Sequence, residues 1–531
     1  MKNVFHFRRR ADVSRFRFPI FLALAVSVAA RAETASSPTA PADAAAITTP
    51  FAMTLPQAPH FPDRDFDLLK YGGVADGQTL NTTAFARAID ACARAGGGRV
   101  IVPPGNWLTG AIHLQSNVDL DLAEGATIRF SADPKDYLPV VPVRWSGFEI
   151  MNYSPLIYAQ DCENIAITGR GTIDGQGKPW WTWAKQLEKT SPRLHQMAVD
   201  NVPVSQRIFG TPEDALRPQL IEPIRCKNVL VEGVTILSGP FWTVQFVYCD
   251  QVIARNLTIR TVGPNNDGIC FDSSRNGLIE DCDISTGDDC ITMKSGLNED
   301  GLRVNRPTEN VVVRRCTTRA GHGGFVVGSE TSGGVRNILV DDCHFLGTDR
   351  GIRLKSARGR GNVVESIWCR NIQMTDIRDE AIQISTFYKA WFGGESGPDP
   401  TFRNIHIQDV TVSGAKTGIS IAGLPEQPIE NVTMQNLQIT AVKGMEGSDI
   451  QGLTLDHVNI EPTTGPDVMV LTDSRNVVIS HSAAPAGCDT FLRVSGAKSS
   501  GIQLLDDNVA SAKTPFQADA GVPAGAVQVQ N

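Results

Sequence analysis

A short phrase recurs along this chain: an asparagine, which favours a turn, followed by a brief strand of alternating polarity. Asn310-Val-Val-Val-Arg-Arg and Asn337-Ile-Leu-Val-Asp-Asp are two copies, 27 residues apart. Self-similarity at a period of this length is typical of solenoids, in which each repeat buries its apolar face only against its neighbours. Further copies begin at Asn164, Asn228, Asn404, Asn431 and Asn476.

These repeats predict an all-β fold, a single-stranded right-handed parallel β-helix. Asn side chains would stack at the turns, and Ile, Val, Leu and Cys would fill the bore. Longer intervals, such as the 64 residues between Asn164 and Asn228, indicate loops inserted into a coil. Only residues 83–94 have a helical pattern, and we expect a short N-terminal helix there that caps the first coil.

Composition fits a folded chain of 531 residues, with 41% hydrophobic and 20% charged residues. Lys and Arg number 49 against 57 Asp and Glu, which gives a net charge of −8. Without a basic run, nucleic acid and anionic membranes are poor partners. An acidic ligand would have to be held by a few local cations.

The first residues have the pattern of a secretory signal. Arginines precede an apolar run over residues 18–30, and Ala30-Arg31-Ala32 resembles a cleavage site. We predict a signal peptide over 1–32, a flexible Ala/Pro/Thr linker over 33–62 and a β-helical catalytic domain over 63–531 whose tail, from about Pro485, caps the last coil. The protein would be exported to the periplasm or the extracellular space. A membrane anchor or a buried helix is the alternative for the apolar run.

The eleven cysteines are an odd number for an exported chain, so a complete disulfide framework is not expected. No CxxC pair or histidine cluster accompanies them, and we predict neither a metal nor a cofactor. Instead they are interpreted as small apolar fillers stacked along the core. Six of them recur within similar phrases, at Cys226, Cys249, Cys282, Cys316, Cys343 and Cys369.

Another register of the repeat places polar residues on successive coils. Side chains alternate along a strand, so Ile352 and Leu354 would point inward, and Arg353 and Lys355 outward. Residues in one column lie about 4.8 Å apart per coil. Aligning the inward residues stacks five segments, which begin at Asp267, Asp289, Gly323, Arg350 and Glu380.

This alignment gathers three carboxylates, one imidazole and two cations on one exposed face: Asp267, Asp288, Asp289, His322, Arg353 and Lys355. Like charges raise the pKa of at least one carboxyl and nearby cations lower another, so an acid and a base can coexist. Glycoside hydrolysis needs such a pair. The two cations suit a substrate that carries carboxylates, and a polyuronide meets both demands.

The chain resembles the polygalacturonase family of pectin-degrading glycoside hydrolases from about Phe66 to about Asn436. The resemblance is carried by four segments in order, supported by 173–177 and 239–243: Asn265-Asn266-Asp267-Gly268, Gly287-Asp288-Asp289, Gly321-His322-Gly323 and Arg353-Leu354-Lys355. Asn266 stands where the family more often has Thr, which leaves Asp267 in place.

This resemblance implies an inverting hydrolase of α-1,4-galacturonosidic bonds that acts on polygalacturonate or oligogalacturonides. It implies that Asp288 is the general acid, that Asp267 and Asp289 activate water, and that His322 shapes the surroundings of the acid. The predicted substrate contacts are Arg353, Lys355, Asn265 and Tyr388. Two features favour attack from a chain end, because they could close one end of the cleft. They are the insertion over 178–218 and the segment 328–334, the latter of which resembles bacterial exo-acting members of the family.

Other interpretations stay open at this stage. A rhamnogalacturonan or other pectin-backbone hydrolase would share the aspartates. A pectate lyase, or a non-catalytic β-helical polysaccharide-binding protein, would be a different class. A calcium site is another alternative, since carboxylates suit calcium; it would be built from Asp267, Asp272, Asp288 and Asp289. Turn aspartates also often cap backbone amides. Two roles are open for the tryptophans of the insertion, packing of the inserted loop or stacking on sugars; they are Trp180, Trp181 and Trp183. Two roles are also open for Arg358 and Arg360: they would extend the cationic face or lie on a solvated one.

Overall fold

The structure of this protein is a computed structural model that describes residues 47–388 and 397–530. The chain divides into two compact units, Met1–Thr48 and Thr49–Asn531. The predicted signal peptide, 1–32, and the first part of the predicted linker, 33–46, lie outside the described residues. The rest of the linker has no helix or strand, and in the second unit the ring of Phe51 lies 5.6 Å from that of Trp368.

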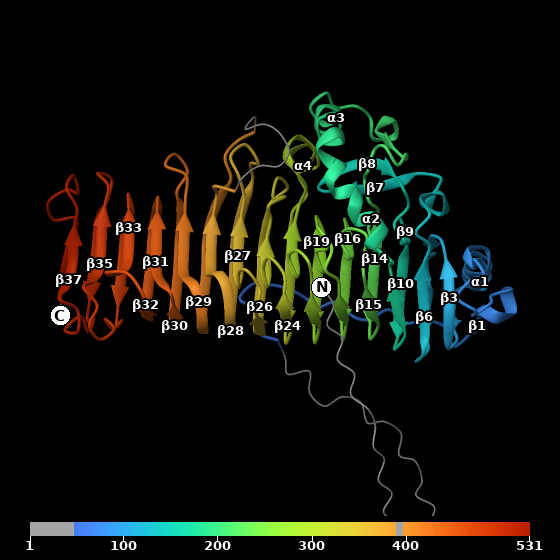
Figure 1. The fold of residues 1–531 in the computed structure, drawn as a ribbon, viewed down its shortest axis with the longest axis horizontal. Helices are drawn as coiled ribbons and strands as arrows, with labels where there is room; N and C mark the ends of the chain where they lie inside the picture. Colours follow the sequence, from blue (N-terminus) through green and yellow to red (C-terminus); the bar gives the residue numbers. More distant parts are fainter. Residues whose placement is uncertain (1–46, 389–396, 531) are drawn as a thin grey trace, which may run out of the picture. The chain divides into compact units, whose positions relative to one another are not determined.

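The second unit is a right-handed parallel β-helix, as predicted, with its coils stacked in a row (Figure 1). One series of parallel strands comprises β1 (Asp65–Asp67), β2 (Gly98–Val102), β5 (Val118–Leu122), β10 (Glu163–Gly169), β14 (Lys227–Glu232), β17 (Asp250–Arg255), β20 (Arg275–Glu280) and β23 (Thr308–Arg314). A second comprises β3 (Gly105–Thr109), β6 (Ala126–Phe130), β11 (Thr172–Asp174), β15 (Thr235–Leu237), β18 (Thr258–Arg260), β21 (Asp283–Ser285) and β24 (Thr317–Ala320).

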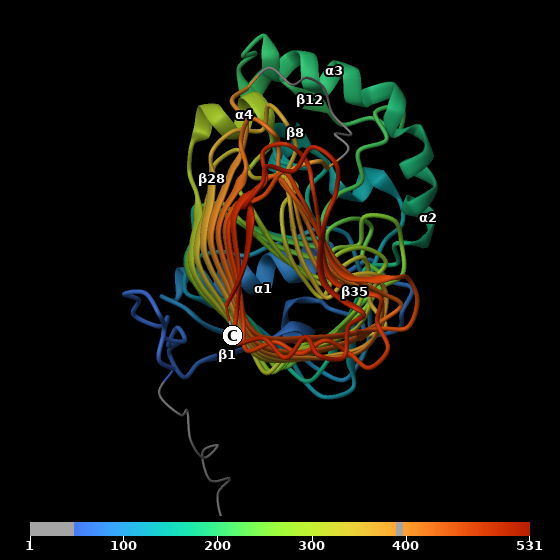
Figure 2. The ribbon, with the colours of Figure 1, turned by 90° about the vertical axis from the view of Figure 1, so that its left-hand side faces the viewer.

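A third series positions the candidate site. It comprises β4 (Ile112–His113), β9 (Ile157–Gln160), β13 (Ile221–Ile224), β16 (Val244–Val247), β19 (Ile269–Asp272), β22 (Ile291–Lys294), β25 (Phe325–Val327) and β27 (Ile352–Lys355). In end view the successive coils superimpose around one core (Figure 2).

In the later coils several strands continue around corners, so that β28 pairs with strands of different faces. These coils contain β26 (Val335–Leu346), β28 (Val363–Ser385), β29 (Thr401–Ala422), β30 (Ile429–Ala441), β31 (Lys443–Ser448), β32 (Ile450–Pro462), β33 (Asp467–Thr472), β34 (Arg475–Ser480), β35 (Thr490–Ser495), β36 (Ser500–Leu505), β37 (Thr514–Ala518) and β38 (Val527–Gln530).

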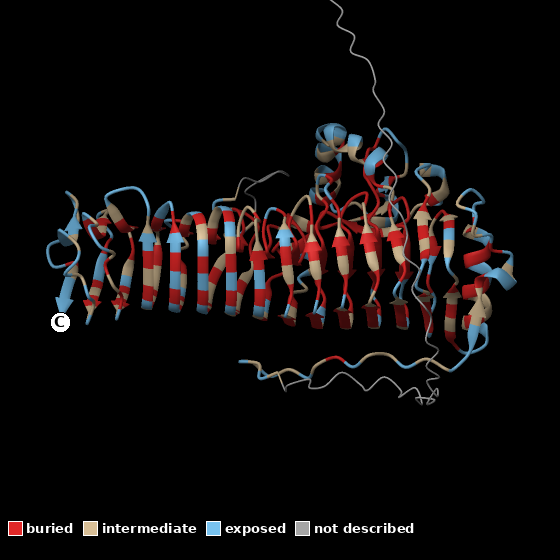
Figure 3. Ribbon diagram, turned by 60° about the horizontal axis from the view of Figure 1, so that its bottom comes forward, coloured by how far each residue is buried: buried red, intermediate tan, exposed pale blue. Residues whose placement is uncertain are grey.

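Alternation of side chains builds the core. Buried residues alternate with exposed ones along many strands (Figure 3), as in β34, where Val477 and Ile479 are fully buried. Because each strand lies beside the same strand of the next coil, these residues form columns, such as Ile269, Ile291 and Phe325. The apolar contacts between coils, rather than one central core, stabilise the fold.

The cysteines are core fillers, but they do not form a single column. All eleven are unpaired. Cys226 and Cys249 precede β14 and β17, whereas Cys343 aligns with Ile372, and Cys369 aligns with Val340. They therefore occupy different columns, because the similar phrases place cysteine at different distances from the turn.

The repeated asparagines stack at a corner of the coil, as predicted. Asn337 has a φ of +57°, in the left-handed region that asparagine tolerates better than most residues. Its Nδ2 donates to Oδ1 of Asn310 at 3.0 Å, and Nδ2 of Asn228 donates to Oδ1 of Asn164 at 2.9 Å. These ladders satisfy side-chain amides that would otherwise be partly buried without partners.

The two ends of the stack differ. Helix α1 (Thr82–Arg94) lies at the first coil, as predicted, and buries Phe85 and Ile89 against the core. The tail after Pro485 does not form a separate cap. It continues the coil through β35 to β38, because Leu492 and Ile502 supply further inward residues.

An insertion rises above the early coils (Figure 1). It contains a small sheet of β7 (Val141–Trp145), β8 (Phe148–Asn152) and β12 (Ile208–Phe209), with helices α2 (Lys178–Trp181) and α3 (Leu187–Val199); α4 (Asn298–Val304) packs beside it. Short 3₁₀ helices lie at Leu68–Tyr71, Pro134–Tyr137, Thr182–Gln186 and Val204–Gln206.

Two fully buried ion pairs join this insertion to the coils and to α4. Nη1 of Arg144, on β7, lies 3.0 Å from Oδ1 of Asp272, on β19. Nη1 of Arg207 lies 2.6 Å from Oδ2 of Asp300, on α4. Breaking such a pair by removing one partner is costly, so both pairs fix the insertion in place. Among the described residues, no helix is both long and apolar enough to cross a membrane.

Candidate active site

The predicted register of the polar segments is confirmed. Ile269 pairs with Ile291, Ile291 with Phe325, Phe325 with Ile352 and Ile352 with Ile382. The residues that precede these strands are therefore stacked, and the backbone N–H of Gly268 donates to the carbonyl of Asp289 at 2.9 Å. The distant segments come together because each coil returns the chain to the same face.

All eight predicted site residues line one cleft of about 770 Å³. Its floor is the third strand series and its rim includes residues of the insertion. The prediction of an exposed face was wrong in one respect: the side chains of Asp267 and Asp289 are only 3% and 2% exposed. Neighbouring side chains and the inserted elements cover them, so the group lies at the bottom of a recess.

Asp267 precedes β19 and pairs with a lysine. Its Oδ2 lies 3.2 Å from Nζ of Lys294. Burial raises the pKa of Asp267 to about 8; Lys294 acts against this, and the charges of Asp288 and Asp289 add to it. Asp267 therefore keeps its proton over the pH range in which most aspartates are ionised.

Asp289 precedes β22 and has stronger cationic partners. Its Oδ2 accepts a hydrogen bond from Nζ of Lys355 at 2.7 Å, and its Oδ1 lies 3.6 Å from Nη1 of Arg353. Burial alone would raise the pKa of Asp289, but Lys355, Arg353 and Lys294 together lower it to about 2. Asp289 is thus ionised although it is as buried as Asp267.

Asp288 is the most exposed of the three carboxylates, at 17%, and contacts His322. Nδ1 of His322 lies 3.0 Å from Oδ1 of Asp288. This hydrogen bond raises the pKa of His322, against the effect of its partial burial. Gly321 allows the approach: it has a φ of +139°, and a Cβ there would lie 2.4 Å from the carbonyl oxygen of Asp288.

Tyr388 covers the two cations that hold Asp289. The centroid of its ring lies 5.2 Å from Nζ of Lys355 and 5.7 Å from Cζ of Arg353, within the range of cation–π contacts. Nε of Arg353 also donates to Oε1 of Gln383 at 3.1 Å. The two cations are therefore held in place from more than one side.

Asn265 lines the cleft through a contact with a buried arginine. Its Oδ1 accepts a hydrogen bond from Nη2 of Arg217 at 2.7 Å, and Nη1 of Arg217 donates to the carbonyl of Pro264 at 2.6 Å. The next residue, Asn266, is fully buried and donates to the carbonyls of Gly239 and Phe241. Asn266 thus fixes the turn that presents Asp267.

Sequence reasoning missed two charged residues that pair with each other in the cleft, Lys294 and Glu330. Lys294 pairs with Asp267 and, at 2.9 Å, with Oε2 of Glu330. Burial would lower the pKa of Lys294, but the charge of Glu330 raises it well above its usual value. The register already contained this signal, since Lys294 occupies the same strand position as Lys355. No comparable signal marked Glu330.

Of the two alternatives for Arg360, the structure favours the cationic face. Arg360 is 2% exposed, lines the cleft and donates to the carbonyl of Ser329 at 2.6 Å. Arg358 is more exposed and forms ion pairs with Glu426 and Asp399.

Two further alternatives can be compared with the structure. Asp272 does not line the cleft but pairs with Arg144, so the four aspartates considered for calcium do not form one group. Trp180 is buried, with its ring 4.9 Å from that of Trp183, and Nε1 of Trp181 donates to the carbonyl of Gly239 at 2.9 Å. Their role is to pack the inserted loop.

Chemically, the cleft combines an ionised carboxylate, a protonated one and a more exposed one with fixed cations. Such an arrangement can donate a proton, hold water for attack and bind an anionic ligand.

Comparison with known proteins fits this geometry. The model of glycosyl hydrolases family 28 matches residues 210–463. A "Probable polygalacturonase" of Vitis vinifera is 31% identical over 418 residues, which cover 75% of this chain and 80% of the relative. The chain belongs to glycosyl hydrolase family 28.

Other similar proteins agree with this family 28 membership. An exo-poly-alpha-D-galacturonosidase of Dickeya chrysanthemi is 27% identical over 74% of this chain and 71% of its own length. The crystal structure of an exopolygalacturonase from Thermotoga maritima has a TM-score of 0.69 and 36% identity, and the match covers 80% of this chain and 94% of that one. This family 28 protein is therefore a glycoside hydrolase with a parallel β-helix fold.

Proposed function

We propose that this family 28 protein hydrolyses α-1,4-galacturonosidic bonds of polygalacturonate or its oligomers, with inversion and from a chain end. One observation carries the proposal: Asp267, Asp288 and Asp289 line a single cleft together with His322 and with the cations Arg353 and Lys355. The opposite pKa shifts of Asp267 and Asp289 agree with a division into acid and base forms. The names of the similar proteins support the same substrate class.

Asp288 is the proposed general acid. It is more exposed than Asp267 and Asp289, so a leaving oxygen in the cleft can reach its carboxyl group. His322 orients this carboxyl through the hydrogen bond at 3.0 Å. The acid and the base carboxyls should stand roughly 6.5 to 9.5 Å apart, as inversion requires.

The nucleophilic water would bind between Asp267 and Asp289. Oδ2 of Asp267 and Oδ1 of Asp289 are buried, and each faces a cation, Lys294 at 3.2 Å and Arg353 at 3.6 Å, without forming a well-aligned hydrogen bond. Both oxygens therefore keep the capacity to accept a hydrogen bond from a water molecule held between them. Ionised Asp289 accepts the proton of the water, and protonated Asp267 helps to orient it.

Substrate binding would make Asp289 a better base. In the free protein, Lys355 and Arg353 lower its pKa to about 2, which is too low for effective proton abstraction. A galacturonate carboxylate that bound these cations would weaken their hold on Asp289 and raise its pKa. Binding of the correct substrate would thereby prepare the base.

The insertion supports attack from a chain end. Leu187 and Ser191 of α3, and Ala184 and Lys185 of the 3₁₀ helix before it, line the cleft. These elements could close one end of the cleft and limit how far a polymer extends beyond the cleaved bond.

Incubation with polygalacturonate and with a defined oligogalacturonide tests the proposal. We expect new reducing ends, small products from the earliest time points, and no ultraviolet absorption from unsaturated sugars. Products that absorb ultraviolet light would indicate a lyase. A ladder of products of mixed sizes would contradict attack from a chain end. Activity on rhamnogalacturonan without activity on galacturonan would show that the proposed substrate is wrong. Retention observed by NMR of the first product would contradict inversion.

We also propose that the protein is exported, on the pattern of residues 1–32 alone. Expression of the full chain followed by N-terminal sequencing should find a mature protein that begins near Glu33.

A further inference from the structure

A second cluster of polar side chains lies in the later coils, away from the catalytic cleft. It is formed at a corner inside β32 and at the end of β34, since Asp456 of β32 pairs in register with Ser480, the last residue of β34. The chain then turns through His457 and His481, which have φ values of +55° and +52°. None of these residues lines the cleft.

Histidine replaces the usual residue at this corner. The same corner is occupied by Asp409 and Asn436 in the two preceding coils and by Asp506 in the following coil, all with φ between +53° and +56°. Asparagine and aspartate are common at such positions, and histidine is tolerated. Two histidines in consecutive coils therefore stack at the distance of the coil repeat.

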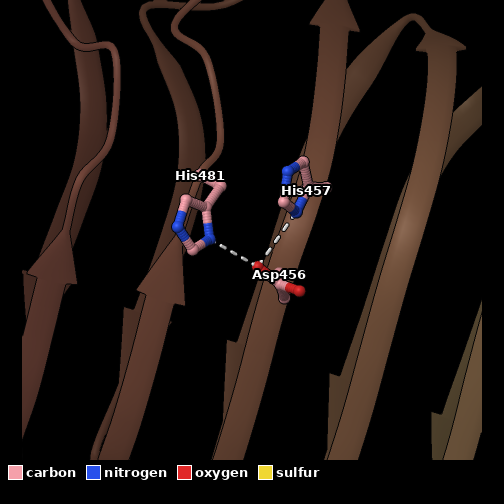
Figure 4. Close-up of side chains that lie close together, drawn as sticks. All are labelled: Asp456, His457 and His481. Atoms are coloured by element: carbon pink, nitrogen blue, oxygen red, sulfur yellow. Dashed lines mark hydrogen bonds and ion pairs between the residues drawn. The ribbon is translucent and has the colours of Figure 1, made fainter.

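The three side chains converge (Figure 4). Nδ1 of His457 lies 3.0 Å, and Nδ1 of His481 2.8 Å, from Oδ1 of Asp456. The imidazole rings are stacked, with centroids 4.8 Å apart and planes inclined by 19°. In the described part of the chain, no other group of three His, Cys, Asp or Glu side chains brings its ligand atoms within 4.8 Å of one another.

Two further hydrogen bonds orient the carboxylate. Nε2 of Gln435 donates to Oδ2 of Asp456 at 3.1 Å, and Oγ of Ser480 donates to Oδ1 at 3.1 Å. Such contacts hold metal ligands in position in known sites. The side chains of His457 and His481 are 53% and 50% exposed, so an ion can reach them from solvent.

We infer that Asp456, His457 and His481 bind a divalent transition-metal ion of the zinc type. Two imidazole nitrogens and one carboxylate oxygen are a ligand set that suits Zn²⁺. Zn–N bonds of 2.0–2.1 Å in a tetrahedron place neighbouring ligand atoms about 3.3 Å apart. The two Nδ1 atoms lie 3.0 and 2.8 Å from Oδ1, and the ligand atoms of the three residues lie within 4.8 Å of one another. Rotations of the exposed imidazoles that move these atoms by at most about 1.5 Å would bring all three ligand atoms to the required spacing.

Water, or Asp506 from the next coil, would supply the fourth ligand. The ion would then link two consecutive coils near the C-terminal end, where strands β37 and β38 are largely exposed. This site is independent of the proposed hydrolysis, and its loss should leave the activity on galacturonan unchanged.

Calorimetric titration of the purified full chain with Zn²⁺ tests the inference. The wild type should bind one ion that the double variant His457→Asn/His481→Asn does not bind. Asparagine is a matched replacement because Asn436 already occupies this corner. His344→Gln, an exposed histidine outside the cluster, is the control and should bind as the wild type does.

Zinc binding that is lost in the double variant occurs at this cluster, whereas binding at other histidines, including His322, would remain. Binding that persists unchanged in the double variant, or no saturable binding in the wild type, would overturn the inference. Gln435→Leu, which removes only the orienting contact, should weaken binding about tenfold. In the wild type alone, Zn²⁺ should raise the Tm, and Co²⁺ should give the absorption spectrum of a tetrahedral ion.

Discussion

At the scale of single residues, partners decide the charge of equally buried groups. Asp267 and Asp289 are both nearly inaccessible, yet the pKa of one is raised and that of the other lowered. Lys294 contacts both Asp267 and Glu330, so its positive charge is shared between two carboxyl groups. Asp289 is contacted by both Lys355 and Arg353. The number of unshared cations therefore determines which carboxyl keeps its proton.

Removing the proposed acid should abolish turnover but not binding. In Asp288→Asn the amide keeps the shape of the carboxyl group but cannot donate a proton to the leaving oxygen. We expect kcat to fall by about 10²- to 10⁴-fold, with binding of a trigalacturonate changed only slightly. Asp200→Asn, on the exposed end of α3, is the control. Substantial activity in Asp288→Asn would show that another residue is the acid.

Replacing a substrate-binding cation should affect both binding and the pH profile. In Lys355→Met we expect the KM for oligogalacturonide to rise at least about tenfold, because a charged contact to the substrate carboxylate is lost. The pKa of Asp289 should also rise, since Lys355 no longer lowers it, and the acidic limb of kcat/KM should move to higher pH. Lys443→Met on the outer surface should change neither, and an unaltered KM in Lys355→Met would exclude this role.

At the scale of elements, the corner ladders link coils independently of the core. Asn337 combines a left-handed backbone with a hydrogen bond to Asn310 in the preceding coil. Both properties come from one short side chain. The ladder therefore fixes the register between neighbouring coils at this corner. The apolar columns are less specific, because they tolerate exchange among Ile, Val and Leu.

Two substitutions should separate the properties of Asn337. Asn337→Ala loses the hydrogen bond and strains the left-handed backbone, and we expect a loss of about 2 kcal/mol in the free energy of unfolding. Asn337→Gly loses the hydrogen bond but relieves the strain, so its loss should be closer to about 1 kcal/mol. Calorimetric Tm values rank the stabilities of the two variants and the wild type. Equal Tm values for both variants would contradict a contribution from backbone strain.

At the scale of the whole molecule, buried carboxyl groups link stability to pH. Burial raises the pKa of Asp119 to about 7 and that of Asp267 to about 8, and it raises the pKa of Glu222 well above its usual value. In the unfolded chain these groups ionise near pH 4. Between pH 4 and 8 the folded protein thus binds more protons than the unfolded one, and its stability falls as pH rises.

We therefore expect a higher Tm at pH 5 than at pH 8. Each such group contributes a slope of at most about 1.4 kcal/mol per pH unit within its own range. Differential scanning calorimetry measures the trend, and Asp267→Asn should show a smaller decline because one of the groups is gone. A Tm that rose from pH 5 to pH 8 would show that these carboxyls are ionised in the folded protein.

Much of the fold follows from local pattern. The asparagine-led strands predicted the β-helix, the residues of α1 predicted the first cap, and the register of the five polar segments matched the observed strand pairing. Period-2 alternation and fixed turn residues are properties of a few consecutive amino acids. Stacking then brings Asp267, Asp288, Asp289 and His322 together by geometry alone.

The remainder depended on contacts between segments that no local pattern relates. Elements of the insertion fold against the coils through Arg144 and Asp272, which are 128 residues apart, and convert an exposed face into a recess. Whether a carboxyl is protonated depends on how far water is excluded and on how many cations contact it. Glu330, which pairs with Lys294, was identified only in the folded cleft. The sequence thus determined which residues share a face, whereas the tertiary structure decided their burial and their charge, because both are set by neighbours that are remote along the chain.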